Sequence, residues 1–177
     1  MKRRKLKLEE LNRINLEEFR EAVKIPLVVV LDNVRSQNNI GSVFRTSDAF
    51  RIEEILLCGI TATPPNVEIH KTALGAEDSV KWRYYNDTMS ALGMLKQEGY
   101  IVYSIEQVEN SQSLESVELD KNKKYAVILG HEVHGVDQNV VNSSDGCIEI
   151  PQYGTKHSLN VSVTAGIVIW DFFKRLK

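Results

Sequence analysis

Short apolar runs alternate with amphipathic stretches along the chain. The apolar runs predict strands, and the stretches between them, where apolar residues recur every three or four positions, predict helices. The predicted strands cover residues 26–31, 53–58, 82–85, 100–105, 125–129 and 146–150. The predicted helices cover residues 15–24, 40–50 and 87–98. This alternation indicates an α/β fold with a mainly parallel sheet flanked by helices.

Two of the predicted helices carry recognisable end signals. Asn15 is placed to cap the helix over residues 15–24, with Glu18 at the capping-box position. Gly99 ends the helix over residues 87–98. The apolar face expected on the first helix consists of Leu16, Phe19, Ala22 and Val23.

Three segments are less clear from their pattern. Residues 67–77, "VEIHKTALGAE", are ambiguous, and the polar residues 109–124 predict a surface loop with one anchoring turn. Residues 159–170, "LNVSVTAGIVIW", are rich in β-branched residues, which is typical of a strand. The remaining length and the aromatic tail also allow a buried helix, and periodicity does not decide between the two.

Composition indicates an ordinary globular protein. The 177 residues are enough for one well-packed domain, with 42% hydrophobic and 26% charged residues. The longest apolar run, "IPLVVVL", has seven residues, whereas a membrane-spanning helix needs about 18 or more. We therefore expect no membrane association. Cys58 and Cys147 lie in strand-like apolar runs, where we expect buried free thiols of a cytoplasmic protein.

Charge is unevenly distributed over the chain. The net charge is −2, but residues 1–25 contain eight Lys/Arg and five Asp/Glu. We therefore divide the chain into a basic N-terminal segment with a short helix, residues 1–24, and one domain, residues 25–177. The basic segment "KRRKLK" fits either a solvated tail or an arm that binds phosphates, and composition does not choose between them.

The stretch "GHEVHG", residues 130–135, raises the question of a zinc site. The H-E-x-x-H pattern places two imidazoles one helical turn apart, at i and i+4. Here His131 and His134 are three positions apart and follow a predicted strand, so they belong to a loop. We expect no metal site. The sequence also lacks G-x-G-x-x-G, a P-loop and G-x-S-x-G, which argues against dinucleotide-binding, P-loop and α/β-hydrolase classes.

Chemistry-bearing residues gather in three segments that follow predicted strands, residues 31–50, 126–137 and 148–167. Each residue also has an ordinary structural interpretation. Asn39 is suited to cap a helix, and Arg45 is spaced to pair with Asp48 on a helix surface. Ser158 and Asn160 are suited to begin the last helix.

Together the three segments resemble a known family. The order N-I-G-x-x-F-R, then strand-G-x-E, then I-P-x-x-G-x-x-x-S-L-N-V-S resembles the SPOUT superfamily. Within it, the chain is similar to the TrmH/SpoU branch of RNA 2′-O-ribose methyltransferases. The resemblance extends over residues 25–175, which is nearly the whole chain.

The resemblance implies a fold and a cofactor. The SPOUT fold is an α/β sheet whose C-terminal part, about residues 125–165 here, forms a deep trefoil knot, with a helix as the last segment. The knot loops of the family bind S-adenosylmethionine. The matching positions in this chain are Ile105, Gly130, Ile150 and Leu159. Family members are homodimers, and the apolar end "GIVIWDFF" suits a buried interface.

The resemblance also implies catalytic residues. Arg45 matches the family arginine that binds the RNA phosphate and helps to activate the ribose hydroxyl. Asn39, Ser158 and Asn160 match polar positions that hold the arginine or the ribose, and Glu132 matches the glutamate of the second motif, which we interpret as organising its loop. The histidines of "GHEVHG" then have no catalytic part. Two residues depart from the family pattern, His131 and Val133, which flank this glutamate.

The expected partner is RNA, either tRNA or rRNA, bound by both subunits of a homodimer. The candidate contacts outside the basic segment are Arg35, Arg51, Lys71, Lys81 and Arg83. A non-catalytic RNA-binding protein on the same fold is the alternative, although the presence of Arg45, Asn39 and Asn160 weakens it. A metal-dependent hydrolase would instead use His131, Glu132, His134 and His70.

Overall fold

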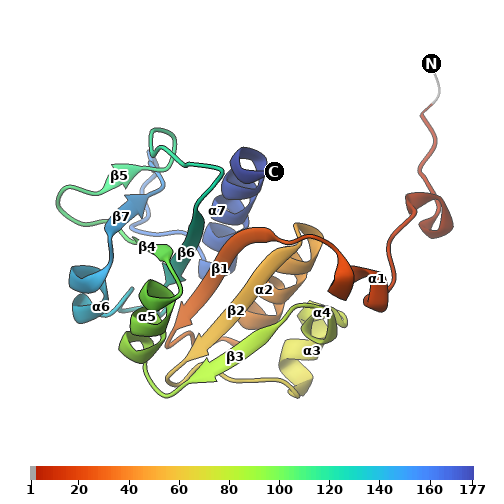
Figure 1. Cartoon of the computed structure of the whole chain (residues 1–177), viewed down its shortest axis with the longest axis horizontal. Helices are drawn as coiled ribbons and strands as arrows, with labels where there is room; N and C mark the ends of the chain where they lie inside the picture. Colours follow the sequence, from red (N-terminus) through yellow and green to blue (C-terminus); the bar gives the residue numbers. More distant parts are fainter. Residues whose placement is uncertain (1–2) are drawn as a thin grey trace.

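The computed structural model describes residues 3–177, apart from the side chain of Leu8. Its centre is a seven-stranded sheet in the order β3-β2-β1-β6-β4-β7-β5, and every neighbouring pair is parallel (Figure 1). The strands are β1 Ile25–Asp32, β2 Ile52–Cys58, β3 Trp82–Tyr85, β4 Tyr100–Ile105, β5 Gln112–Ser113, β6 Lys124–Leu129 and β7 Gly146–Glu149. The predicted α/β class with a mainly parallel sheet is confirmed.

Helices cover both faces of the sheet. They are the 3-10 helix η1 Leu8–Leu11 and the α-helices α1 Leu16–Glu21, α2 Gln37–Ala49, α3 Val67–Ala73, α4 Ala76–Ser79, α5 Thr88–Gln97, α6 Gln138–Ser143 and α7 Val161–Leu176. One face packs against α2, α3, α4 and α7, and the other packs against α5 and α6 (Figure 1). Within residues 3–177, no helix combines the length and apolar character needed to span a membrane.

The central strand β1 is buried on both faces. Leu27, Val29 and Leu31 belong to one hydrophobic core, and Val28 and Val30 belong to the other. A strand with helices on both sides needs apolar residues at every position. This explains why residues 27–31 form a continuous apolar run instead of an alternating pattern.

Helix α1 is shorter and less buried than its pattern predicts. Its N-terminus is as expected, because Asn15 Oδ1 accepts the Glu18 N–H and the Glu18 carboxylate accepts the Asn15 N–H, at 2.9 and 2.8 Å. Of the predicted apolar face, however, only Phe19 is buried, and Val23 is 88% exposed. The helix ends at Glu21, so Val23 lies beyond it and leaves the helical face.

The predictions for the second half of the chain were partly wrong. The segment over residues 109–124 contains β5, which pairs with β7, and residues 138–143 form the unpredicted helix α6. The ambiguous C-terminal segment is the helix α7, as the resemblance implies, and the strand alternative is wrong. Its β-branched residues adopt a helix because one face is buried in the core, which outweighs local propensity. That face consists of Val161, Ala165, Val168, Ile169, Phe172 and Leu176.

Both cysteines are free thiols, but only Cys58 is buried. The prediction of a buried Cys147 is wrong, since this residue is partly exposed. It lies on β7, which is close to one edge of the sheet and has only the two-residue strand β5 outside it.

Gly41 sets the close approach of α2 to α3. A Cβ atom at this position would lie 2.1 Å from Thr72 Oγ1 and 2.2 Å from the Ile69 carbonyl oxygen. The Thr72 hydroxyl also donates to the Asn38 carbonyl at 2.9 Å, and this hydrogen bond joins α3 to α2 beside Gly41. The glycine of the N-I-G motif is therefore explained by packing.

We expect Gly41→Ala to lower the free energy of unfolding by about 1–3 kcal/mol, because the added methyl group must displace a backbone carbonyl. Gly93→Ala is the matched control, since Gly93 lies inside α5 with no atom within 4 Å of the added carbon. The control should be neutral or stabilising by up to about 1 kcal/mol, because alanine favours helix interiors. Urea denaturation of both variants measures the difference, and equal effects would contradict the packing argument.

Candidate active site

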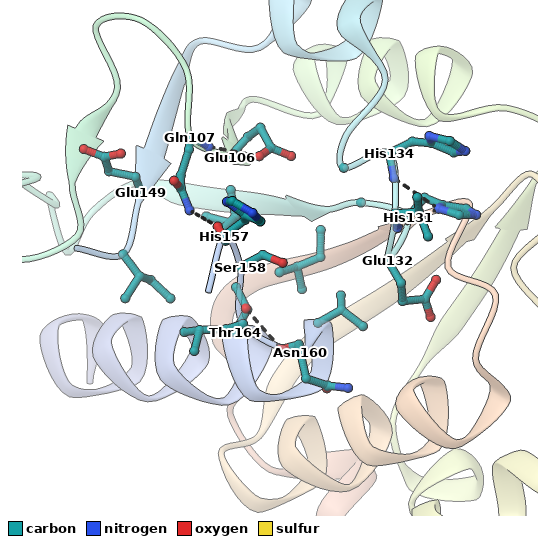
Figure 2. Close-up of a pocket in the computed structure, with 18 of the residues that line it drawn as sticks. Glu106, Gln107, His131, Glu132, His134, Glu149, His157, Ser158, Asn160 and Thr164 are labelled. Carbon is teal, nitrogen blue, oxygen red and sulfur yellow. Dashed lines mark hydrogen bonds between the residues drawn. The ribbon is translucent and has the colours of Figure 1, made fainter. Parts of the chain in front are cut away.

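A pocket of about 540 Å³ opens at the carboxyl ends of β4, β6 and β7. Its wall comes from four stretches of chain, residues 105–107, 129–135, 148–152 and 157–161, and from Thr164 on α7 (Figure 2). The carboxyl ends of the strands of an open parallel sheet are the usual place for a ligand site. The pocket therefore lies where the fold favours binding.

The loop after β6 is a tight turn that only glycine permits at its base. A Cβ atom on Gly130 would lie 2.1 Å from the Gly135 carbonyl carbon and 2.2 Å from the Val136 nitrogen. Gly135 has a φ of +68°, which glycine adopts without strain. His131 and Gly135 exchange backbone hydrogen bonds of 3.0 and 2.8 Å across the turn. Residues 130–135 thus form one closed loop along the pocket.

The Glu132 carboxylate fastens this loop to the segment after β1. It accepts the backbone N–H groups of Ser36 and Arg35 at 2.9 and 3.1 Å, and the Asn39 amide at 3.2 Å. Partial burial raises the pKa of Glu132, but the hydrogen bonds from Ser36, Arg35 and Asn39 together outweigh it, so the pKa lies below its ordinary value. The carboxylate form is therefore the one that the site stabilises.

Asn39 extends this connection to the last helix. The Asn160 amide donates to Asn39 Oδ1 at 3.2 Å, while the Asn39 amide donates to Glu132. Asn160 is also the N-cap of α7, since its side-chain oxygen accepts the Ser162 N–H at 2.9 Å. Two side-chain hydrogen bonds therefore join residues from all three sequence motifs.

The ordinary interpretation of Asn39 as a helix cap is wrong. Ser36 caps α2, and its hydroxyl oxygen accepts the Asn39 N–H at 3.3 Å. Asn39 therefore lies in the first turn of α2, with its side chain free to bond the other two motifs. For Asn160 the capping interpretation is correct, and the bond to Asn39 is additional.

Arg45 lies outside the pocket, on the exposed side of α2. The helix-surface pair with Asp48 is absent, and the Asp48 carboxylate accepts the Ser79 hydroxyl at 2.5 Å. Within residues 3–177, the guanidinium of Arg45 has no ion pair or hydrogen bond. Its charge is therefore available to a ligand that approaches along α2.

The residues that the resemblance assigns to the cofactor do meet at the pocket. Ile105, Gly130, Ile150 and Leu159 all line it, and so do Glu132, Ser158 and Asn160. The structure thus gathers seven of the nine predicted site residues around one cavity, with Asn39 bonded to its edge and Arg45 further along α2.

Two pocket residues and one buried carboxylate that fixes a loop were missed in the sequence. Glu106 and Gln107 line the pocket directly after β4. The Glu106 carboxylate accepts the Val136 N–H at 3.1 Å, and the Gln107 amide donates to the His157 carbonyl at 3.1 Å. Asp32, which is buried at the end of β1, accepts the Asp137 N–H at 2.8 Å. The only indication of these residues in the sequence is their place, as polar residues at the end of an apolar strand.

The histidines do not assemble a metal site. His131 and His134 stack with their ring centroids 4.8 Å apart, and His70 pairs with Glu77 on α4 at 2.5 Å. In the part of the chain that the structure describes, no three His, Cys, Asp or Glu side chains are grouped to hold a metal ion. The four residues of the hydrolase alternative are therefore not brought together.

Comparison with known proteins now identifies the family. The model of the SpoU rRNA Methylase family matches residues 26–170. The chain belongs to this family. It is 32% identical over 162 residues to a tRNA (guanosine(18)-2'-O)-methyltransferase of Thermus thermophilus, covering 92% of this chain and 81% of the relative. The predicted resemblance to the TrmH/SpoU branch is confirmed.

The chain is also similar to other RNA methyltransferases in sequence and in structure. The chain is 31% identical over 161 residues to the 23S rRNA (guanosine-2'-O-)-methyltransferase RlmB of Nitrosomonas europaea. The match covers 90% of this chain and 61% of that relative. The A. aeolicus TrmH/SpoU tRNA modifying enzyme has a similar structure, with a TM-score of 0.80 at 26% identity over 90% of this chain and 80% of that one. The AdoMet-bound rRNA methyltransferase from Sinorhizobium meliloti shares the fold, with a TM-score of 0.80 at 23% identity, over 90% of this chain and 60% of that one.

The hydrogen bonds that the Glu132 carboxylate accepts predict a pH-dependent contribution to the free energy of unfolding. Because the folded-state pKa of Glu132 is lowered, its contribution is complete above the unfolded-state pKa of about 4.3 and is lost as pH falls through the folded-state pKa. We expect Glu132→Gln to lower the free energy of unfolding by about 1 kcal/mol at pH 7, a small value because water reaches the carboxylate. The difference from wild type should shrink below pH ~4.

Denaturation curves measured from pH 7 to pH 3 test this. Glu149→Gln is the matched control, because Glu149 lines the same pocket and joins another loop through its backbone carbonyl, which accepts the Leu114 N–H at 2.8 Å, and not through its carboxylate. The control should leave the curve of stability against pH unchanged. A difference between Glu132→Gln and wild type that stays constant from pH 7 to pH 3 would contradict the assignment.

Proposed function

We propose that the chain is an S-adenosylmethionine-dependent methyltransferase that modifies a ribose 2′-hydroxyl of tRNA or rRNA. The observation that carries the proposal is the connection from Glu132 through Asn39 to Asn160, which joins the three motifs beside the pocket. The relatives named tRNA and rRNA methyltransferases belong to the same family. The experiment that tests the proposal is transfer of a labelled methyl group from S-adenosylmethionine to RNA.

The pocket suits S-adenosylmethionine in size and lining. Its volume of about 540 Å³ lies within the range of about 300–1,000 Å³ that is usual for small-molecule sites. Ile105, Ile150 and Leu159 offer apolar surface for a base, and the loop at Gly130 brings backbone groups to the wall of the pocket. The bound cofactor supplies an activated methyl group on a sulfonium.

Arg45 would act on the RNA and not on the cofactor. A guanidinium keeps its proton in proteins, so Arg45 cannot serve as a general base. Beside a ribose it would hold the neighbouring phosphate and stabilise the negative charge that develops on the 2′-oxygen. Asn39 and Asn160 would fix the ribose position through their link. Ser158 lines the same pocket two residues before Asn160, the N-cap of α7 (Figure 2). Positioning of this kind supplies much of the rate of a transfer reaction.

The sheet order supports the knot. β7 lies between β4 and β5, although β4 and β5 are consecutive strands and β6 lies on the other side of β4. The loop between β4 and β6, residues 106–123, therefore crosses from one side of β7 to the other and back. The Arg175 guanidinium donates to the Val117 and Leu114 carbonyls at 2.5 and 2.6 Å, which fastens this loop to the C-terminal helix. We propose a trefoil knot at about residues 125–165 on this basis.

Some of the cations predicted to contact RNA already form ion pairs within the protein, which leaves fewer candidates. Arg83 donates from Nε and Nη2 to the two carboxylate oxygens of Glu54, both at 2.7 Å. Lys81 pairs with the same carboxylate, and Lys71 pairs with Glu68. The hydrogen bond from Arg83 to Glu54 raises the pKa of Arg83. These three cations are therefore poorer candidates than Arg35 and Arg51. The described part of the basic segment "KRRKLK", residues 3–7, projects from the domain, and we propose it as a phosphate-binding arm (Figure 1). We also propose that the protein is cytoplasmic, since both of its cysteines are free thiols.

An apolar surface on α7 supports a homodimer. Val163, Ile167 and Trp170 are 50, 38 and 49% exposed, and their spacing places them on one side of α7. The Trp170 ring also packs against Phe50 and Phe173. Exposed apolar residues that gather in one patch, and do not occur singly, mark an interaction surface. We propose that a second copy of the chain covers this patch.

We expect Arg45→Ala to lower the rate of methyl transfer at least about 100-fold, because it removes a charge that acts in the transition state. S-adenosylmethionine affinity, measured by calorimetry, should stay within about twofold of wild type, since Arg45 does not line the pocket. Arg45→Lys should recover part of the rate. Lys123→Ala, which removes an exposed charge outside the pocket, is the control. Wild-type protein that binds RNA but transfers no methyl group would favour the non-catalytic alternative.

Trp170→Glu should convert a dimer into a monomer, because the charge would be buried in the proposed interface. Light scattering after gel filtration gives the mass of each form. Val67→Glu places the same charge on an apolar residue that is 73% exposed on α3, and should leave the dimer intact. A monomeric wild type would overturn the proposed interface.

A further inference from the structure

The tip of the loop over residues 130–135 is held by the ring of His131. His131 Nδ1 accepts the backbone N–H of Val133 at 3.0 Å and that of His134 at 3.3 Å. Val133 is 72% exposed, and no other described residue bonds these two N–H groups. The base of the loop has the two backbone bonds between His131 and Gly135, and Glu132 is fastened by its carboxylate. The tip alone depends on the imidazole.

This arrangement requires one particular form of the ring. A nitrogen that accepts two N–H groups cannot carry a hydrogen, so the proton of a neutral ring must be on Nε2. When histidine takes up a second proton, Nδ1 becomes a donor and faces two other donors. The stacked ring of His134 adds repulsion if it is protonated as well. The closed loop therefore favours the neutral ring.

We propose that His131 is a positioning residue of the methyl-donor pocket, and that its neutral imidazole keeps the loop over residues 130–135 closed for cofactor binding. All six residues of the loop line the pocket, so opening of the tip changes the wall that the cofactor contacts. Uptake of a proton by the ring then competes with cofactor binding. The binding part of this inference rests on the proposed function, whereas the tautomer of the ring does not.

Other titratable groups surround the same pocket. His134 and Glu132 belong to the loop itself, Glu106 follows β4, Glu149 ends β7, and His157 lies in the stretch before α7 (Figure 2). The Glu132 carboxylate is turned toward Ser36 and Arg35, whose hydrogen bonds help to lower its pKa. His134 and His157 are therefore the groups that the experiment must separate from His131.

Calorimetric titration with S-adenosylmethionine from pH 8 to pH 5 tests the proposal in wild type, His131→Asn, His131→Leu, His134→Asn and His157→Asn. Wild-type affinity should fall by up to about tenfold for each pH unit below the titration of the ring, the limit for one proton. His131→Asn should bind with little dependence on pH, because an asparagine side-chain oxygen accepts the same N–H groups and does not titrate. His131→Leu should bind weakly at every pH. His134→Asn and His157→Asn line the pocket and can change the affinity itself, but both should keep the loss of affinity at low pH, because His131 is intact.

Nitrogen NMR of the histidine rings gives a second measurement that needs no cofactor. We expect Nδ1 of His131 to be unprotonated at neutral pH, and the Val133 amide signal to shift when the ring takes up its second proton. A His131→Asn variant with the wild-type pH dependence, or a proton on Nδ1 at neutral pH, would overturn the proposal. If no form binds S-adenosylmethionine at any pH, the proposed function fails, and the binding role of His131 fails with it. The NMR result then decides the tautomer separately.

Discussion

The site depends on carboxylates that satisfy backbone N–H groups of neighbouring loops. Loops at the end of a parallel sheet have no strand partner, and a buried or half-buried N–H without an acceptor is costly. Glu132 accepts the N–H groups of Ser36 and Arg35, Glu106 accepts that of Val136, and Asp32 accepts that of Asp137. Each bond joins loops that follow different strands, so the three carboxylates fix the loops relative to one another.

These hydrogen bonds join segments at the pocket that are far apart in the sequence. Glu132 and Arg35 are 97 residues apart, and Asn39 and Asn160 are 121 residues apart. Displacement of one loop therefore moves the others, since they share acceptors. The two glycines at the base of the loop after β6 are needed for the same reason. A side chain on Gly130 would occupy the place of the Gly135 and Val136 backbone and separate the loop from its neighbours.

Much of the sheet could be predicted from the sequence, whereas the region from β5 to α7 could not. β1 is buried on both faces, so its five apolar residues 27–31 identify it without other information. β5 has two residues and is held by its pairing to β7, so no local pattern predicts it. The C-terminal segment has the composition of a strand and forms α7, because its burial against β1 and α2 decides its structure.

The sequence by itself determined the α/β class, the central strands and the residue types of the three motifs, because apolar periodicity and strand-end polar residues are local properties. Tertiary structure decided the contacts among them. Nothing local shows that Asn39 bonds both Glu132 and Asn160 instead of capping α2, or that Arg45 has no partner on its own helix. Such choices depend on which loops the sheet order brings together, and the sheet order follows from pairings between strands far apart in the chain.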